Sequence, residues 1–253
     1  MKQRYFIFLS YKGTAYHGWQ IQPNGISVQA LLMDAFSTVL RTNIEIVGAG
    51  RTDTGVHAQL MVAHFDFEGS LAAFPNLISR LNNILARDIS ISKILAVQSD
   101  AHARFDAVSR KYEYHIIFKK DVFKYGLAAR FNGNFDFKRM NEAAATILEY
   151  RDFTSFSKLH TDAKTNNCVV KQAQWIQKAE NEWVFVIDAD RFLRNMVRAI
   201  VGTLLEVGRG KINVEQFRQI IEAQDRCKAG VSVPAEGLYL VDIKYPESIF
   251  IID

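Results

Sequence analysis

A glycine-rich segment with a single carboxylate is the part of the chain best suited to carry chemistry. It spans residues 48–57 and reads GAGRTDTGVH. Its glycines tolerate positive φ and let another chain come close to the backbone, and Asp53 at its centre could act on a ligand as a base or a nucleophile. Apolar runs at 44–47 and 60–67 flank the segment, so we expect a loop between two strands. A polar hairpin in which Asp53 only accepts backbone N–H bonds is the alternative.

Aromatic side chains supply further candidates. Residues 16–25 are dense in aromatic and amide groups, which can stack on nucleobases and bond to their edges. The tyrosine and the tryptophan of this segment could instead pack against a sheet, and we expect this for at least one of them. A strand predicted at 109–118 places Arg110, Tyr112 and Tyr114 on one face, because side chains repeat with a period of two. The high strand propensity of tyrosine explains both tyrosines equally well.

A basic cluster lies late in the chain. The pattern of apolar residues predicts a helix that opens near residue 190 and runs to about 207. Arg191, Arg194 and Arg198 follow one another at spacings of three and four, so we expect them on one face of that helix. Such a face can bind a polyanion, and it can also be a simple solvated surface.

Composition limits the class of protein. The chain has 253 residues, 49% of them hydrophobic, and a formal net charge of +4, which permits a polyanionic partner without demanding one. Its two cysteines, Cys168 and Cys227, are far apart and argue against a zinc site. No apolar run approaches the ~18 residues of a membrane span, and the first residues lack the apolar core of a signal peptide. We therefore expect a soluble cytoplasmic protein without membrane contact.

The predicted elements indicate an α+β fold. Alternating residues predict strands, and apolar residues at helical spacing predict helices. Ser27 caps the first predicted helix. Pro75 either sits in the first turn of the second predicted helix or marks where that helix begins. The repeated order of elements suggests two similar lobes, each a mostly antiparallel sheet with helices on one face. The expected strands are 4–11, 60–67, 89–95, 109–118, 169–178, 183–187 and 238–243, and the expected helices follow Ser27 and lie within 71–85, 140–148, 190–207 and 214–223.

Seven ordered motifs resemble those of one enzyme family. The segment from Gly50 to His57 resembles the active-site loop of the tRNA pseudouridine synthase A family, which usually reads GRTDAGVH. Further matches follow in the family's order over almost the whole chain, whereas a lone GRTD would be weak evidence. They are Tyr16 to Gln20 with Gln22, His102 to Phe105, Arg110 to Tyr114, Asp152 to Phe156, Met196 to Arg198 with Ile200 to Gly202, and Glu236 to Leu240.

The resemblance implies a reaction and an essential group. Members of this family isomerise uridine to pseudouridine by breaking the N1–C1′ bond, turning the uracil and rejoining it through C5. Asp53 matches the essential carboxylate, either as a nucleophile or as the base that removes a proton from C2′, and the sequence leaves both open. The reaction is neither redox chemistry nor hydrolysis, so no cofactor and no metal are expected.

The resemblance also assigns supporting residues. Tyr112 matches the tyrosine expected to stack on the uracil, Arg198 the cation that keeps the catalytic carboxylate ionised and oriented, and Leu238 an apolar residue of the uracil pocket. Arg51 would help to hold the target nucleotide out of its stack. Phosphate contacts from basic residues could offset the cost of extrusion. The candidates for those contacts are Arg104 and Lys158.

The implied architecture places the active site between two lobes. Residues 1–103 would carry the Asp53 loop, and residues 104–253 would complete the cleft. The implied substrate is the anticodon stem-loop of tRNA at positions 38–40, bound by a homodimer. An RNA-binding protein without catalysis, a nucleoside hydrolase or glycosidase, and a pseudouridine synthase of another specificity are the alternatives. The hydrolase would need a second carboxylate beside Asp53, which the segment lacks.

The chain departs from the family pattern at a few positions. Lys12 stands where an aspartate is common, Ile21 replaces a frequent arginine, and Thr54 replaces the alanine beside Asp53. Leu60 and Met61 replace a pair that is usually Gly-Gln or similar. These changes affect the expected RNA path and leave the expected catalytic residues in place.

Overall fold

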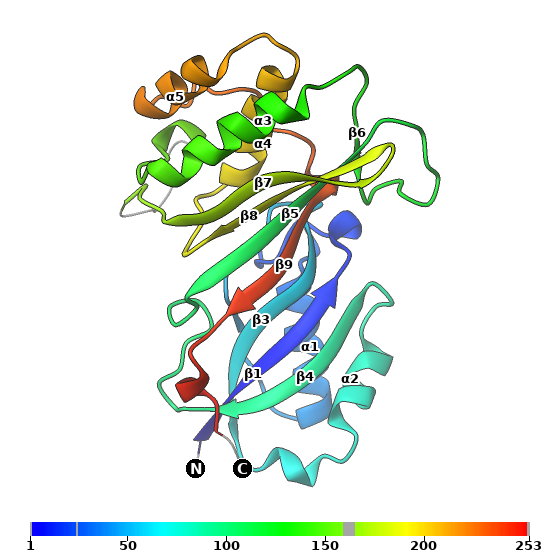
Figure 1. Ribbon diagram of the computed structural model, residues 1–253. Coiled ribbons are helices and arrows are strands. Elements are labelled where there is room, and N and C mark those ends of the chain that lie inside the picture. Colours follow the sequence, from blue (N-terminus) through cyan, green and yellow to red (C-terminus); the bar gives the residue numbers. More distant parts are fainter. Residues whose placement is uncertain (1, 24, 159–164, 252–253) are drawn as a thin grey trace. The chain divides into compact units, whose positions relative to one another are not determined.

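The computed structural model describes residues 2–23, 25–158 and 165–251 (Figure 1). Residue 24, which belongs to the aromatic segment at 16–25, lies outside the described part. The chain folds as two compact units. The first contains the residues up to Val108 together with those from Leu240 onward, and the second runs from Ser109 to Tyr239.

The first unit is built on an antiparallel sheet. Strand β1 (Lys2–Tyr11) lies between β3 (His57–Glu68) and β4 (Ile89–Val97) and pairs antiparallel with both. A short strand, β2 (Val47–Gly48), pairs antiparallel with β3. Of the apolar run at 44–47, only Val47 belongs to this strand. The residues before it bond elsewhere, because the N–H of Ile44 donates to the Ser37 hydroxyl and the carbonyl of Ile46 accepts from the Gln29 side chain.

Two helices accompany this sheet. Helix α1 (Val28–Leu40) begins where expected, since the Ser27 hydroxyl accepts the N–H of Ala30. Helix α2 (Leu77–Ile84) packs on β4 and on α1, and it begins two residues after Pro75. A helix that begins at residue 71 is therefore wrong, because the helix is shorter. Only the alternative in which Pro75 marks the beginning is confirmed. A 3-10 turn, Leu71–Ala73, occupies the residues before it.

The second unit supplies further strands, and the described strands of the chain form one nine-stranded sheet. Strand β8 (Glu182–Ala189) lies between β5 (Ser109–Ile117) and β7 (Val170–Ala179), antiparallel to both, and a two-residue strand, β6 (Ala129–Arg130), pairs parallel with β5. The expected hairpin of β7 and β8 is confirmed. Strand β9 (Leu238–Lys244) begins in the second unit and continues into the first.

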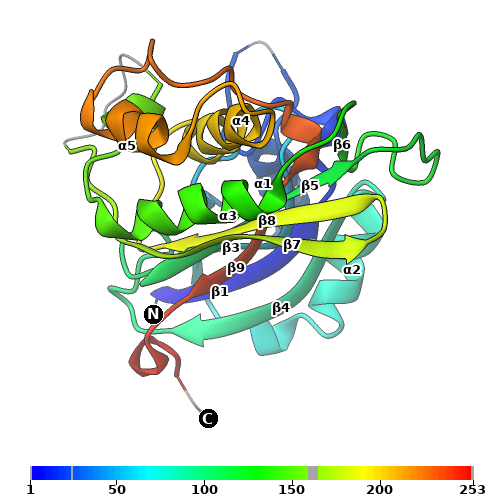
Figure 2. The same ribbon diagram turned by 45° about the horizontal axis from the view of Figure 1, so that its top comes forward.

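Three α-helices lie in the described part of the second unit. Helix α3 (Phe137–Thr146) packs on β7, and α4 (Met196–Gly208) and α5 (Val214–Glu222) pack against α3 (Figure 2). The ring of Phe137 stacks on Trp183 with centroids 3.6 Å apart. A capping box between Asn213 and Gln216 fixes the beginning of α5. The fold class is α+β, as the sequence predicts.

The start of α4 differs from the prediction. Asp190 accepts N–H bonds from Val169 at 2.7 Å and from Arg191 at 2.7 Å, which favours a turn over a helix at this point. Asn195 is left-handed, with φ of 68°, and helix residues follow only from Met196. Arg191 and Arg194 therefore lie before the helix, and the expected face shared by three arginines does not form.

Two further features bear on the class of protein. No helix in the described part of the chain is long and apolar enough to cross a membrane. Cys168 is buried and Cys227 is exposed, and both are free thiols, as expected from their spacing.

Candidate active site

The Asp53 loop connects β2 to β3 through a tight turn. The carbonyl of Asp53 accepts the N–H of Val56 at 3.1 Å, and Gly55, the third residue of this turn, has φ of +80°. That combination is typical of a type II turn, which requires glycine at its third position. Asp53 itself is half-buried.

A second loop holds the Asp53 loop from the side. The N–H of Trp19 donates to the carbonyl of Thr52, and the N–H of Gly55 donates to the carbonyl of Tyr16, each at 3.3 Å. The buried hydroxyls of Tyr11 and Thr52 also bond to each other at 2.8 Å. The backbone on both sides of Asp53 is thus fixed by residues from the first part of the chain.

Tyr16 and Trp19 have a structural role in this arrangement. Their side chains are 5% and 2% exposed, so both pack in the core. The expectation that at least one of them packs is confirmed, and the alternative that they stack on bases is wrong for both. The hydroxyl of Tyr16 donates to Asp88, and burial together with this bond raises the pKa of Tyr16. His57, at the end of the loop, is also buried and accepts the N–H of Gly13 at 2.9 Å.

Glycines make this close packing of two loops possible. Gly18 has φ of +85°, and a Cβ on it would lie 2.2 Å from the Thr52 carbonyl oxygen. A Cβ on Gly48 would lie 2.4 Å from Nε1 of Trp19. In contrast, a Cβ on Gly50 would meet nothing within 4 Å, and Arg51 and Thr54 are exposed. The loop is therefore tight on its inner side and open beside Gly50.

We expect Gly18→Ala to destabilise the first unit by about 3 kcal/mol. Of this, roughly 1–2 kcal/mol comes from placing an L side chain at positive φ, and overlap with the Thr52 carbonyl adds roughly 1–3 kcal/mol. Urea unfolding of the purified variant measures the change. Gly210→Ala is the matched control, because Gly210 has φ of +70° and open space around it. Equal stability losses in the two variants would contradict the close approach.

Tyr112 and Arg198 lie in the second unit. Tyr112 is a half-buried residue of β5, paired with Ile187 of β8, and its ring meets Phe192 edge-on with centroids 5.0 Å apart. Arg198 lies in the first turn of α4, and its Nε donates to the carbonyl of Val233 at 2.7 Å. The N–H of Val233 donates back to the carbonyl of Arg198 at 3.2 Å. Arg198 is thus tied to the segment that leads into β9.

The same segment positions Leu238. Leu238 is the first residue of β9 and is 7% exposed. Shortly before it, the carbonyl of Pro234 accepts the hydroxyl of Tyr114 at 2.8 Å, and a Cβ on Gly237 would lie 2.9 Å from Cζ of the same tyrosine. Tyr114 is fully buried, which raises its pKa. The two tyrosines therefore differ: Tyr114 is buried and anchors the 234–237 segment, whereas Tyr112 is half-buried.

The place of Arg198 in its helix is informative. A helix N-terminus carries a partial positive charge, so a cation in the first turn is unfavourable unless an anion lies nearby. Helix stability alone would favour an acidic residue at this position. The combination of Arg198 with the α4 N-terminus therefore forms a locally positive site that suits a carboxylate or a phosphate.

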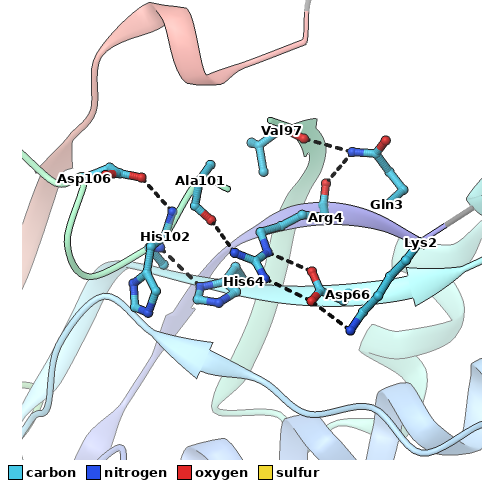
Figure 3. Close-up of polar contacts among 10 residues, drawn as sticks. Lys2, Gln3, Arg4, His64, Asp66, Val97, Ala101, His102 and Asp106 are labelled. Atoms are coloured by element: carbon cyan, nitrogen blue, oxygen red, sulfur yellow. Dashed lines mark hydrogen bonds and ion pairs between the residues drawn. The ribbon is translucent and has the colours of Figure 1, made fainter. Parts of the chain in front are cut away.

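The His102 motif forms a turn held by side chains from β1 and β3 (Figure 3). Arg4 and Asp66 face each other across these strands, and the guanidinium makes two bonds to the carboxylate, at 2.7 and 2.9 Å. Arg4 also donates to the carbonyl of Ala101 at 3.0 Å. Asp106 accepts the N–H of His102 at 2.6 Å, which closes the turn. The expected phosphate ligand Arg104 and the exposed Phe105 are thereby presented on a fixed backbone.

His64 also holds the turn at His102. The sequence patterns did not single out His64, Arg4 or Asp66 as residues that position this turn. Its Nδ1 accepts the N–H of Ala103 at 3.2 Å, and its ring meets His102 edge-on with centroids 4.6 Å apart. Burial, and then the nearby charge of Arg4, lower the pKa of His64 to about 4. His64 is therefore neutral near pH 7, which leaves Nδ1 able to accept.

We expect His64 to make stability fall with decreasing pH. Its ring is neutral in the folded chain down to a pKa of about 4, whereas in the unfolded chain it protonates below about 6.5. The unfolded state thus binds more protons, and stability drops between these two values by about 2 kcal/mol after allowance for solvent screening. Urea midpoints measured across this range should flatten in His64→Gln and not in His17→Gln, an exposed histidine. The same slope in His64→Gln as in wild type would contradict the assignment.

Known proteins of similar sequence cover nearly the whole chain. The chain is 59% identical over 248 residues to the tRNA pseudouridine synthase A of Bacteroides fragilis, with 98% of each chain covered. The chain belongs to the tRNA pseudouridine synthase A family. It is 56% identical to the synthase of Parabacteroides distasonis over 98% of both chains, and 42% identical to that of Hydrogenovibrio crunogenus over 96% of this chain and 92% of the relative.

Membership in the tRNA pseudouridine synthase A family makes the chain an isomerase that modifies tRNA. A family model described as tRNA pseudouridine synthase matches residues 143–246, which contain Arg198 and Leu238. Asp53 lies outside that range, but the alignments with synthase relatives cover 98% of the chain. Among the residues that the structure describes, no group of three or more His, Cys, Asp or Glu side chains is arranged to hold a metal ion.

Proposed function

We propose that the chain isomerises uridine to pseudouridine at positions 38–40 of the tRNA anticodon arm, with Asp53 acting on the target nucleotide. The observation that carries the proposal is the Asp53 loop itself. A half-buried aspartate stands on a type II turn fixed from one side, while Gly50 leaves open space beside it. A nucleotide turned out of its stack needs this kind of access to a reacting group.

Asp53 begins the reaction, and the uracil completes it. The carboxylate attacks C1′ or removes a proton from C2′, and the N1–C1′ bond breaks. The uracil then turns and C5 bonds to C1′. This step breaks the ester bond between Asp53 and C1′ or, on the other route, is accompanied by return of the proton to C2′. The proton on C5 leaves, and N1 ends protonated. Atoms and charge balance without an oxidant or a water molecule, so the reaction needs no cofactor and no metal.

The other predicted residues take roles that fit their surroundings. Tyr112 stacks on the uracil, and Leu238 adds an apolar wall. Arg198 pairs with the Asp53 carboxylate, which supplies the anion that its position in the first turn of α4 favours. Arg51, exposed two residues before Asp53, holds the extruded nucleotide.

The proposed arrangement needs both halves of the chain. The lobe with the Asp53 loop supplies the reacting group, and the lobe with Tyr112, Arg198 and Leu238 completes a cleft around the uracil. The working form is a homodimer that binds tRNA through its anticodon stem-loop. Phosphate contacts from Arg104 and from Lys158 offset the cost of extruding the nucleotide.

Release of tritium from tRNA that carries [5-³H]uridine tests the proposed function. Each turnover frees the hydrogen on C5, so purified protein should release tritium in proportion to the pseudouridine formed. Release should stop after the few target uridines of each tRNA are consumed. A protein that binds this tRNA and releases no tritium would contradict the proposal and favour RNA binding without catalysis.

A further inference from the structure

The loop that follows β5 exposes large aromatic side chains. Within Lys119–Tyr125, which we call the KF loop, Phe123 is 88% exposed, Tyr125 86% and Val122 69%. The loop projects from the second unit between β5 and β6, as the green segment beside β6 in Figures 1 and 2. None of the seven family motifs includes it. Contiguous exposure of this kind is uncommon on a soluble protein and marks an interaction site.

The backbone of the KF loop is held in place from several sides. The carboxylate of Asp121 accepts the N–H of Phe123 at 2.9 Å. The carbonyl of Lys124 accepts the N–H groups of Leu127 and Ala128, at 2.9 and 3.1 Å. The hydroxyl of Tyr239 donates to the carbonyl of Leu127 at 2.6 Å. The aromatic rings are therefore presented outward by an ordered loop, and a partner would not have to order it first.

The charges around the loop indicate the chemistry of that partner. Lys119, Lys120 and Arg130 are exposed, and the Lys124 ammonium pairs with Glu182, which neutralises that carboxylate. Asp121 is the acidic residue inside the loop, and it is occupied as a backbone acceptor. Two lysines followed by two outward aromatic rings suit a partner with negative charge and flat apolar faces, which is the chemistry of unpaired nucleotides.

A second copy of the chain fits these features less well. A stable dimer buries about 800 Å² on each partner, with a core depleted in lysine. The KF loop offers three apolar side chains beside two exposed lysines. The charge complementarity therefore favours RNA over a protein surface.

We propose that the KF loop is a second contact with tRNA, outside the residues that act on the uracil. Phe123 and Tyr125 stack on unpaired bases, and Lys119 and Lys120 bind the adjoining phosphates. The inference rests on the proposed function for the identity of the RNA as tRNA. It adds a site that sets affinity for the whole tRNA, whereas the Asp53 loop and its partners carry the reaction.

Variants of the full-length protein test this contact by filter binding with unmodified tRNA. Phe123→Ala combined with Tyr125→Ala should raise the Kd for tRNA by about tenfold or more, because stacking is lost for two bases. Phe123→Leu combined with Tyr125→Leu keeps apolar side chains and should weaken binding to a similar degree. Lys119→Ala combined with Lys120→Ala should reduce the slope of log K against log salt by about 1.5.

The controls separate this contact from catalysis and folding. Ile84→Ala removes an exposed apolar side chain of α2, and Lys138→Ala an exposed lysine of α3; both should leave the Kd unchanged. All KF loop variants should keep the wild-type melting temperature and the wild-type turnover at saturating tRNA. A wild-type Kd in the alanine variants would overturn the inference. If the sedimentation mass of those variants changed while the Kd did not, the inference would also be overturned, and the loop would be assigned to contacts between copies of the chain. A wild-type protein that binds tRNA through this loop and releases no tritium would overturn the proposed function alone.

Discussion

Asp53→Asn should abolish pseudouridine formation while tRNA binding stays near the wild-type value. Asparagine keeps the size and the turn of the loop, but its amide can neither attack C1′ nor accept a proton from C2′. We expect tritium release to fall by at least about 10³-fold, at the upper end of what a single acid–base group contributes. Filter binding on the same tRNA then measures affinity separately from turnover.

Two further variants sharpen this result. Asp53→Glu keeps the carboxylate but displaces it by one methylene, and misplacement on this scale costs about 10²-fold, so partial activity is expected. Asp34→Asn removes an exposed carboxylate on α1 and should release tritium as wild type does. Wild-type release by Asp53→Asn would exclude Asp53 from the reaction.

Arg198→Ala should produce the second largest loss, about 10²-fold or more in turnover at saturating tRNA. The substitution removes the cation that we place beside Asp53, and a positioned charge contributes on this scale. It also removes the bond from Nε to the Val233 carbonyl, so a stability loss of roughly 1–3 kcal/mol accompanies it. Turnover is measured by tritium release and stability by urea unfolding, on the same preparations.

Arg198→Lys distinguishes the electrostatic role from the structural one. Lysine keeps the charge but lacks the planar group that can bond to Val233 and to an anion at once, so intermediate turnover is expected. Arg194→Ala is the matched control, because Arg194 is exposed and lies before α4. Turnover that survives in Arg198→Ala at the wild-type level would contradict the proposed pairing with Asp53.

Sequence patterns predicted the local elements of this chain well. Strand β1 and helix α1 follow from alternation, apolar spacing and the Ser27 cap, all of which act over a few residues. The start of α4 was missed because two local features oppose the apolar spacing, the Asp190 turn and the left-handed Asn195. Helical spacing alone could not show that Arg191 and Arg194 precede the helix.

Long-range arrangement was beyond local patterns. The cross-strand pair of Arg4 and Asp66 joins residues far apart in the chain, and periodicity shows only which face each residue occupies. Packing was expected for at least one of Tyr16 and Trp19, but the partner of Trp19 could not be predicted, since its burial depends on the close approach of its loop to Gly48. Residue types and spacing made Asp53, Tyr112 and Arg198 candidates, whereas Leu238 came from the family resemblance alone. The roles of all four are predictions, and the variants above test those of Asp53 and Arg198.

The most direct test of the central claim maps pseudouridine in a tRNA transcript after incubation with the purified protein. The transcript carries uridine at positions 38, 39 and 40 and elsewhere in the molecule. We predict pseudouridine at one or more of these three positions with wild-type protein, and at none with Asp53→Asn. Pseudouridine formed only outside the anticodon arm, or none at all with the wild-type protein, would contradict the account.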